Sequence, residues 1–142
     1  MKVAICFHGL MRNMSQESYL KLKENILDIL TKNNIQYDIY VHTFIMPFIN
    51  NERSGENKIT LRNDDYKILK PKKFKLEIQK NVDNKLNHQL YRKVGDWWYD
   101  DFNSMKNIVR SFHSQYECYK LINNPNQYNL IFCMRPDIYY AD

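Results

Sequence analysis

Charged and polar side chains follow directly after three apolar segments of this chain. The segment Leu130–Met134 is followed by Arg135, a proline and Asp137, and two earlier apolar segments, 3–7 and 39–41, also end at polar residues. Because proline has no N–H and cannot continue a central ladder, we expect the polar groups on either side of it where the strand leaves its sheet. The resulting set comprises His8, Gly9, Arg12, His42, Arg135 and Asp137.

Arginines beside a carboxylate indicate phosphate and metal chemistry. A guanidinium group binds phosphate oxygens through two parallel hydrogen bonds, and a hard divalent cation prefers oxygen ligands such as the carboxylate of Asp137. Asp142 offers a second carboxylate. The set therefore favours a diphosphate that is held with the help of a divalent cation. The alternative is that Arg135 and Asp137 form an ion pair with each other.

These side chains can meet only if the three apolar segments are parallel neighbours in one sheet. Strands joined by helices are usually parallel, so their carboxyl ends share one edge, where open α/β sheets bind ligands. The unbroken apolar segment Leu130–Met134 is typical of a strand covered on both faces, which predicts a central position beside the segment 3–7, with 39–41 on the other side of 3–7. The predicted fold class is α/β, a Rossmann-like, mainly parallel sheet flanked by helices.

The periodicity of apolar residues predicts the elements around this sheet. Ser15 is the expected N-cap of a helix that ends at Asn33-Asn34, and a second helix is expected over 103–123. Strict alternation over Lys73–Ile78 predicts an edge strand. The side chains expected to face the core are Phe74, Leu76 and Ile78 in that strand, and Met105, Ile108, Val109, Phe112, Tyr116 and Tyr119 in the second helix.

Composition predicts one soluble domain over residues 1–142. Hydrophobic residues make up 44% and charged residues 26% of the chain, which is ordinary for a globular protein. The net charge of +5 comes from 21 basic and 16 acidic residues. Part of it lies in a lysine cluster, which we interpret as a solvated edge strand in preference to a nucleic-acid surface. The lysine cluster comprises Lys67, Lys70, Lys72, Lys73, Lys75 and Lys80.

Several features restrict the function further. The three glycines are isolated, so no Walker loop or dinucleotide fingerprint can form, and kinase, GTPase and dehydrogenase functions lose their main support. Cys6, Cys118 and Cys133 are predicted as buried core residues in a reducing compartment. The polar stretch 45–63 predicts a long surface loop. No apolar run approaches membrane-spanning length, and a cytoplasmic location is expected.

Four short motifs follow one another along the chain. They are Gly9-x-x-Arg12, Asp38-Ile39-Tyr40-Val41-His42-Thr43, Ser114-Gln115-Tyr116, and Tyr128-Asn129-Leu130-Ile131 leading to Arg135-x-Asp137. Their order resembles that of GT-A-type glycosyltransferase-like proteins of bacterial and large-virus polysaccharide loci. The resemblance spans nearly the whole chain, and the order of all four motifs is its specific part.

The resemblance implies that the protein is an enzyme, a glycosyltransferase. Its Rossmann-like, GT-A-like half would bind a nucleotide-diphosphate sugar, and the sugar would be transferred to a hydroxyl group of a glycan acceptor. The Arg-x-Asp carboxylate then takes the place of the metal-binding Asp-x-Asp motif, although Ile138 and Tyr139 stand where a second close carboxylate is usual. No residue is assigned as general base. By position, Gly9 and Arg12 line the nucleotide pocket, Arg110, Ser114 and Gln115 face it, and Asp137 holds Mn²⁺ or Mg²⁺.

A function of another class is also open. A non-catalytic module would bind nucleotides or nucleic acid through the lysine cluster and Trp97-Trp98-Tyr99, although we interpret this aromatic triplet first as an anchor of its loop to the core.

GT-A-like enzymes place the acceptor site after the metal-binding carboxylate, and this chain ends at Asp142. We therefore expect the donor-binding half of a transferase, either part of a longer protein or in need of a partner, with an uncovered sheet edge that favours homo-oligomers.

Overall fold

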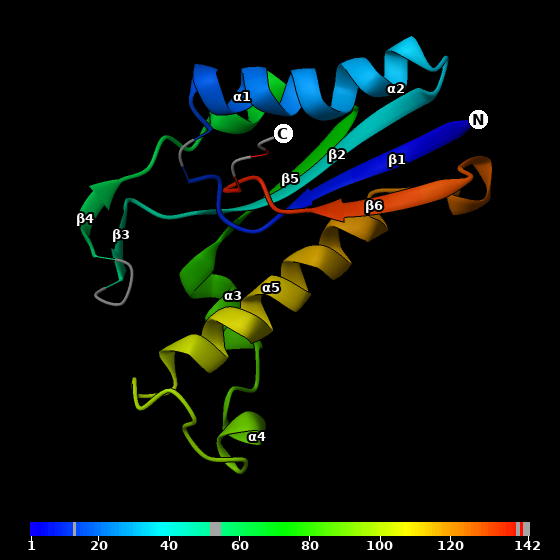
Figure 1. Cartoon of the computed structure of the whole chain (residues 1–142). Helices are drawn as coiled ribbons and strands as arrows, with labels where there is room; N and C mark the ends of the chain where they lie inside the picture. The colour runs from blue at the N-terminus through cyan, green and yellow to red at the C-terminus, as the bar shows by residue number, and fades with distance from the viewer. Residues whose placement is uncertain (13, 52–54, 139, 141–142) are drawn as a thin grey trace.

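The fold is a parallel β-sheet between two layers of helices (Figure 1). The structure, a computed structural model, describes residues 1–12, 14–51, 55–138 and 140. The main sheet has the strand order β5-β2-β1-β6, and each neighbouring pair is parallel. The predicted Rossmann-like α/β class is confirmed, as is the position of the first strand between the other two. The strands are β1 (Lys2–His8), β2 (Gln36–Ile45), β5 (Lys73–Ile78) and β6 (Leu130–Met134).

The strand β6 lies at an edge of the sheet, so the prediction of a central strand is wrong. Leu130 is 50% exposed and Phe132 is 42% exposed. Five apolar residues in a row are enough to form a strand, but they do not specify how many neighbours that strand has. Cys133 on β6 is exposed for the same reason, whereas Cys6 and Cys118 are buried as predicted.

One helical segment connects β1 to β2. The hydroxyl oxygen of Ser15 accepts a hydrogen bond of 3.1 Å from the backbone N–H of Ser18, which confirms the predicted N-cap. The segment ends at Asn33, and Asn34 follows in the left-handed conformation with φ 54°. Its parts are α1 (Gln16–Leu22), a π-helical turn (Lys23–Leu27) and α2 (Asp28–Lys32).

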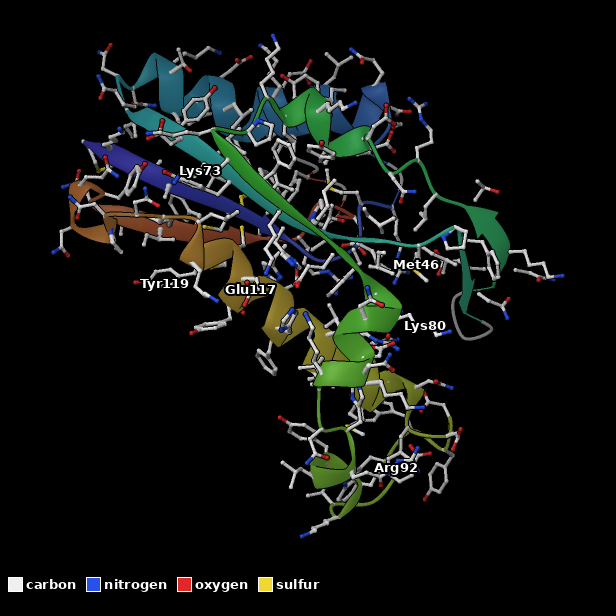
Figure 2. The ribbon with its side chains drawn as sticks, turned by 180° about the vertical axis from the view of Figure 1, so that it is seen from behind. Met46, Lys73, Lys80, Arg92, Glu117 and Tyr119 are labelled. Carbon is white, nitrogen blue, oxygen red and sulfur yellow. The ribbon has the colours of Figure 1, made fainter. Side chains whose placement is uncertain are left out.

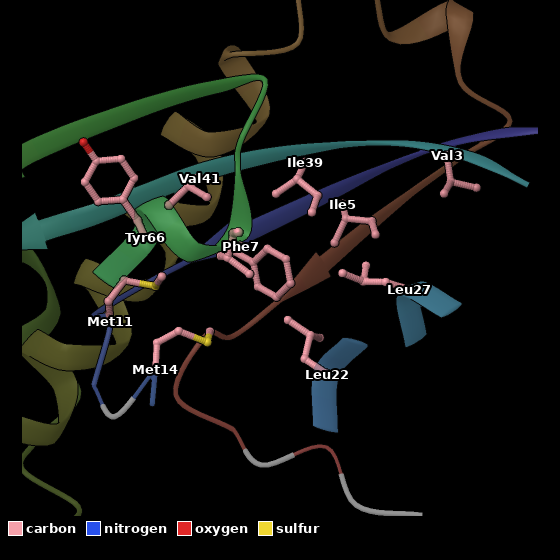
Figure 3. Close-up of a cluster of buried hydrophobic side chains, with 11 residues drawn as sticks. Val3, Ile5, Phe7, Met11, Met14, Leu22, Leu27, Ile39, Val41 and Tyr66 are labelled. Carbon is pink, nitrogen blue, oxygen red and sulfur yellow. The ribbon is translucent and has the colours of Figure 1, made fainter. Parts of the chain in front are cut away.

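This helical segment covers a hydrophobic core on one face of the sheet (Figure 3). Val3, Ile5 and Phe7 of β1 are fully buried, and Leu22 and Leu27 of the helical segment belong to the same cluster. Moving one such side chain out of water contributes about 1.5–3 kcal/mol to folding. The remaining buried members are Met11, Met14, Ile39, Val41, Tyr66 and Leu69.

The second predicted helix is α5 (Asn103–Lys120), which crosses the opposite face of the sheet (Figure 1). Only two of the six apolar side chains predicted to face the core do so. The predicted orientation is wrong because the side chains of α5 that face the sheet lie off this stripe. Ser114 is buried against His42, and Cys118 packs in a small apolar cluster with Ala4, Cys6 and Tyr40. Met105 and Val109 are buried, whereas Ile108, Phe112, Tyr116 and Tyr119 are 42% to 66% exposed.

The strand β5 is an edge strand, as predicted, but its apolar face is only partly covered. Phe74 is 50% exposed and Ile78 is 52% exposed, and of the three side chains predicted to face inward only Leu76 is partly buried against the core. The alternate side chains, including Lys75 and Glu77, lie against α5, where they form ion pairs with Glu117 and His113.

Two further predictions about loops are wrong. The stretch predicted as a long surface loop contains an antiparallel hairpin of β3 (Phe48–Asn51) and β4 (Glu56–Thr60). The aromatic triplet does not anchor its loop, because Trp97 is 75% and Tyr99 is 95% exposed. The shorter helices are a 3₁₀ turn (Asp65–Leu69), α3 (Gln79–Lys85), α4 (Gln89–Arg92) and a second 3₁₀ turn (Pro125–Gln127).

A group of polar side chains binds Asp38 at the amino end of the sheet. The Nζ atoms of Lys72 and Lys2 lie 2.8 and 2.9 Å from Asp38 Oδ2, and the hydroxyl of Tyr128 donates a hydrogen bond to the same oxygen. Burial opposes ionisation of this carboxyl group, but the three hydrogen bonds outweigh burial and lower its pKa to about 2.

Among the described residues, no helix is long and apolar enough to cross a lipid bilayer.

We expect Leu22→Ala to lower the free energy of unfolding by about 2–5 kcal/mol, because a fully enclosed side chain leaves a cavity when it is shortened. Leu20→Ala is the matched control: it changes the same residue type on the same helix, but Leu20 is 44% exposed whereas Leu22 is 1% exposed. The control should cost less than about 0.5 kcal/mol in urea unfolding. Equal losses for both variants would contradict the described orientation of α1.

We expect Asp38→Asn to remove part of the acid sensitivity of the fold. Because the pKa of Asp38 falls from 3.8 to about 2 on folding, its contribution is present above pH 3.8 and is lost as the pH falls through about 2. The contribution is on the order of 2 kcal/mol. Unfolding curves of the wild type and the variant should therefore converge as the pH falls towards 2. Asp64→Asn, at a side chain 61% exposed, serves as control and should change the free energy of unfolding by less than about 0.5 kcal/mol at neutral pH.

Candidate functional site

A pocket of about 90 Å³ opens at the carboxyl edge of the sheet, where the sequence predicted a ligand site. Its walls come from the turn after β1, the first half of α5, the segment after β6, and the ends of β2 and β5. Six residues named from the sequence are among those that line it. The lining residues are His8, Gly9, Leu10, Arg12, Phe44, Gln79, Asn107, Arg110, Ser111, Arg135 and Asp137.

Each arginine of the pocket contacts a carboxylate. Arg135 forms a two-pronged ion pair with Asp137, with Nε–Oδ1 2.9 Å and Nη2–Oδ2 2.6 Å. Arg110 contacts Asp83 in the same way, with both bonds 2.7 Å long. Of the two arrangements considered from the sequence, the structure therefore has the ion pair between Arg135 and Asp137. Only Asp137 among these acids lines the pocket itself, so three arginines face one carboxylate there.

The geometry at Asp137 does not fit a divalent cation. Both carboxylate oxygens accept hydrogen bonds from Arg135, and Nε of Arg12 lies 3.9 Å from Oδ2. A metal ion would have to displace one guanidinium group and sit beside another. Asp142, the second carboxylate suggested by the sequence, lies outside the described residues. We derive no step through Mn²⁺ or Mg²⁺ at this position.

Two buried nitrogen atoms beside the pocket lack a hydrogen-bond partner among the described residues. They are Nδ1 of His8 and Nε of Arg12. Arg12 uses its Nη1 atom instead, at 2.9 Å from Glu56 Oε2. Burial lowers the pKa of His8, and the nearby charge of Arg135 lowers it further, so the imidazole is neutral at neutral pH. Buried polar atoms are nearly always paired in proteins, so unpaired ones at the wall of a pocket point to a ligand.

The hydroxyl group of Ser114 joins three elements directly beneath the pocket. Its oxygen accepts a 2.7 Å hydrogen bond from the backbone N–H of Gly9 and lies 2.6 Å from Nδ1 of His42. Gly9 has φ 102°, a conformation that other residues rarely adopt, so a glycine is needed at this turn. Ser114 and His42 are fully buried and do not line the pocket. Ser114 and His42 act instead by positioning Gly9. Gln115, which the sequence also placed at the site, does not line the pocket.

A second cluster, formed by His42, Glu77 and His113, lies between α5 and the sheet. Oε2 of Glu77 is 2.9 Å from Nε2 of His42 and 2.8 Å from Nε2 of His113. Its Oε1 atom is 3.3 Å from Nζ of Lys75, which also contacts Glu117 at 2.5 Å. Figure 2 labels Glu117 on α5, which lies below β5 in that view and passes behind α3.

The charges in this second cluster follow from its contacts. Burial opposes ionisation of Glu77, but hydrogen bonds from His113, His42 and Lys75 outweigh burial and lower its pKa to about 2. Burial lowers the pKa of His42 against the influence of Glu77, so His42 is neutral at neutral pH. Glu77 and His113 could not be predicted as a pair from the sequence, because only the contact of α5 with β5 brings them together and no motif joins them.

Comparison with protein-family models gives no match to this chain, and neither the curated proteins nor the solved structures contain a match to it. The function is therefore argued from the pocket and its residues.

Proposed function

We propose that the pocket binds the diphosphate of a nucleotide-sugar donor and that the protein serves as the donor-binding part of a glycosyltransferase. One observation carries this proposal: Nδ1 of His8 and Nε of Arg12 are buried without a hydrogen-bond partner among the described residues, in a pocket lined by three arginines. An anion with several oxygen atoms would accept a hydrogen bond from Nε–H of Arg12 and, when the proton of the neutral imidazole is on Nδ1, from His8 as well.

The position of the pocket supports a nucleotide ligand. Open parallel sheets bind ligands beyond the carboxyl ends of their strands, and the pocket lies where β1, β2 and β6 end. Gly9 brings bare backbone to the pocket wall, and nothing lies within 4 Å of where its side chain would start. A phosphate group can therefore approach this turn closely.

The arginines would contribute to sugar transfer through charge. Breaking the bond between the sugar and the diphosphate leaves negative charge on the departing diphosphate, and positive groups held in place beforehand stabilise that charge. Arg12, Arg110 and Arg135 are held in place by their carboxylate partners, and phosphate oxygens would replace some of those contacts. The acceptor would be a glycan hydroxyl group. We assign no general base.

The exposure of the aromatic triplet favours a second function, the stacking of nucleic-acid bases. Trp97 and Tyr99 are 75% and 95% exposed. Not all of the lysine cluster lies on this aromatic surface. Lys73 binds Asn123, which follows α5, whereas the aromatic triplet precedes α5. A helix of 18 residues is about 27 Å long, so Lys73 and the triplet lie near opposite ends of α5. Salt-sensitive binding of single-stranded oligonucleotides would support this second function.

The proposal predicts that UDP, GDP or one of their sugar conjugates raises the melting temperature, because a ligand that binds only the folded state stabilises it. Arg12→Ala should weaken that binding roughly 10- to 100-fold, through loss of a hydrogen bond to a charged group. Arg62→Ala is the matched control, since its side chain is 80% exposed and does not line this pocket. Absence of a shift with every nucleotide, or equal shifts for the two variants, would contradict the proposal.

Asp137→Asn separates binding by arginines from binding through a metal ion. The substitution removes the charge that occupies Arg135, so we expect nucleotide affinity in the presence of EDTA to be retained or increased. If Asp137 instead holds Mn²⁺, affinity measured with Mn²⁺ should fall sharply in the variant. Isothermal titration calorimetry of wild type and variant, each with EDTA and with Mn²⁺, measures both effects.

A further inference from the structure

Three side chains with metal-binding atoms converge beneath α5 from three separate elements. His42 comes from β2, Glu77 from β5 and His113 from α5, and one ligand atom of each lies within 4.8 Å of the other two. Two imidazole nitrogens and a carboxylate oxygen form a ligand set that holds Zn²⁺ in proteins, with a fourth position for water. We propose that His42, Glu77 and His113 form a binding site for Zn²⁺ or a chemically similar transition-metal ion.

The separations are close to those that a tetrahedral ion requires. Zinc bonds of about 2.0–2.1 Å at tetrahedral angles place neighbouring ligand atoms about 3.4 Å apart. The Nε2 atoms of His42 and His113 are 2.9 and 2.8 Å from Oε2 of Glu77, so each must move away by about 0.5 Å. One ring nitrogen of each histidine lies within 4.8 Å of one ring nitrogen of the other, so the two imidazoles also need to approach each other. Side-chain adjustments of this size leave the backbone in place.

The surrounding contacts hold the ligands in a suitable orientation. Metal-bound histidine donates its other ring N–H to a nearby acceptor, and Nδ1 of His42 lies 2.6 Å from the hydroxyl oxygen of Ser114. When Nδ1 carries the proton, the Ser114 hydroxyl can donate instead to the backbone oxygen of His42, 3.3 Å away. Lys75 binds Oε1 of Glu77 at 3.3 Å and leaves Oε2 to the metal.

The site has access to solvent on the side of His113. The side chains of Glu77 and His113 are 14% and 18% exposed, whereas His42 is fully enclosed. His113 also lines a mostly apolar groove of about 420 Å³ between α5 and the segment after α3. His113 is therefore the member of the cluster that borders a groove. Phe44 packs against both imidazoles, with its ring centre 5.3 Å from that of His42 and 6.4 Å from that of His113.

The test is calorimetric titration of Zn²⁺ into the full chain after EDTA treatment, without nucleotide. We expect saturable binding of one ion per chain. Replacement with Co²⁺ should give the visible absorption of a tetrahedral site. His113→Asn and Glu77→Gln should each weaken binding by roughly 100-fold or more, beyond the 10- to 100-fold typical of a supporting residue. Ser114→Ala should weaken it within that supporting range.

Two matched variants keep this result interpretable. His88→Asn removes a histidine outside the cluster, and Cys133→Ser removes the exposed thiol that could bind zinc by itself, so both should retain wild-type affinity. Circular dichroism in EDTA checks that each variant is folded. Absence of saturable binding, or unchanged affinity in both folded His113→Asn and Glu77→Gln, would overturn the proposal and show that the cluster is a hydrogen-bonded structural group. Because nucleotide is absent, this outcome is independent of the arginine pocket.

Discussion

The hydrogen bonds of the Ser114 hydroxyl group hold the carboxyl edge of the sheet together. This one buried oxygen contacts the backbone N–H of Gly9 after β1 and the imidazole of His42 on β2, while its own chain belongs to α5. Neither strand can shift along α5 without leaving a buried polar group unpaired, which costs about 1–3 kcal/mol. The arginine pocket lies on one side of this contact and the cluster of His42, Glu77 and His113 on the other, so both depend on it for their shape.

The polar contacts of α5 help to explain the apolar side chains that this helix exposes. Glu117 binds Lys75 and His113 binds Glu77, so polar side chains share the sheet-facing side of the helix with Cys118, which packs in a cluster with Ala4 and Cys6. The opposite side of the helix must then face outward, and it carries Phe112 at 66% exposure. Buried ionic groups rarely add stability compared with apolar ones of the same volume. Their presence under α5 is therefore easier to understand as a binding arrangement than as a means of holding the helix.

Local signals in the sequence were sufficient for the strands of the main sheet, for the two long helical segments that cover it, and for the pocket. The Ser15 cap, the apolar character of β1 and the polar residues after each strand depend on neighbours in the chain, and six of the predicted site residues do line one pocket. The orientation of the helices on the sheet could not be predicted from local signals alone. Periodicity shows that α5 is amphipathic, yet it cannot show that polar side chains such as Glu117 pair with the sheet, so the apolar stripe was assigned to the core. Glu77 and His113 were missed because only the packing of α5 on β5 brings them together.

The two proposed sites share Ser114, yet they can be occupied independently. In the metal-free state the neutral imidazole of His42 donates from Nε2 to Glu77, and Nδ1 accepts the Ser114 hydroxyl proton. With a metal ion on Nε2, the proton sits on Nδ1 and the hydroxyl group turns towards the backbone oxygen of His42. In both states a lone pair of the Ser114 oxygen still accepts the N–H of Gly9. The turn that forms the pocket wall therefore keeps its position, and only a proton and a hydroxyl rotor change between the two states.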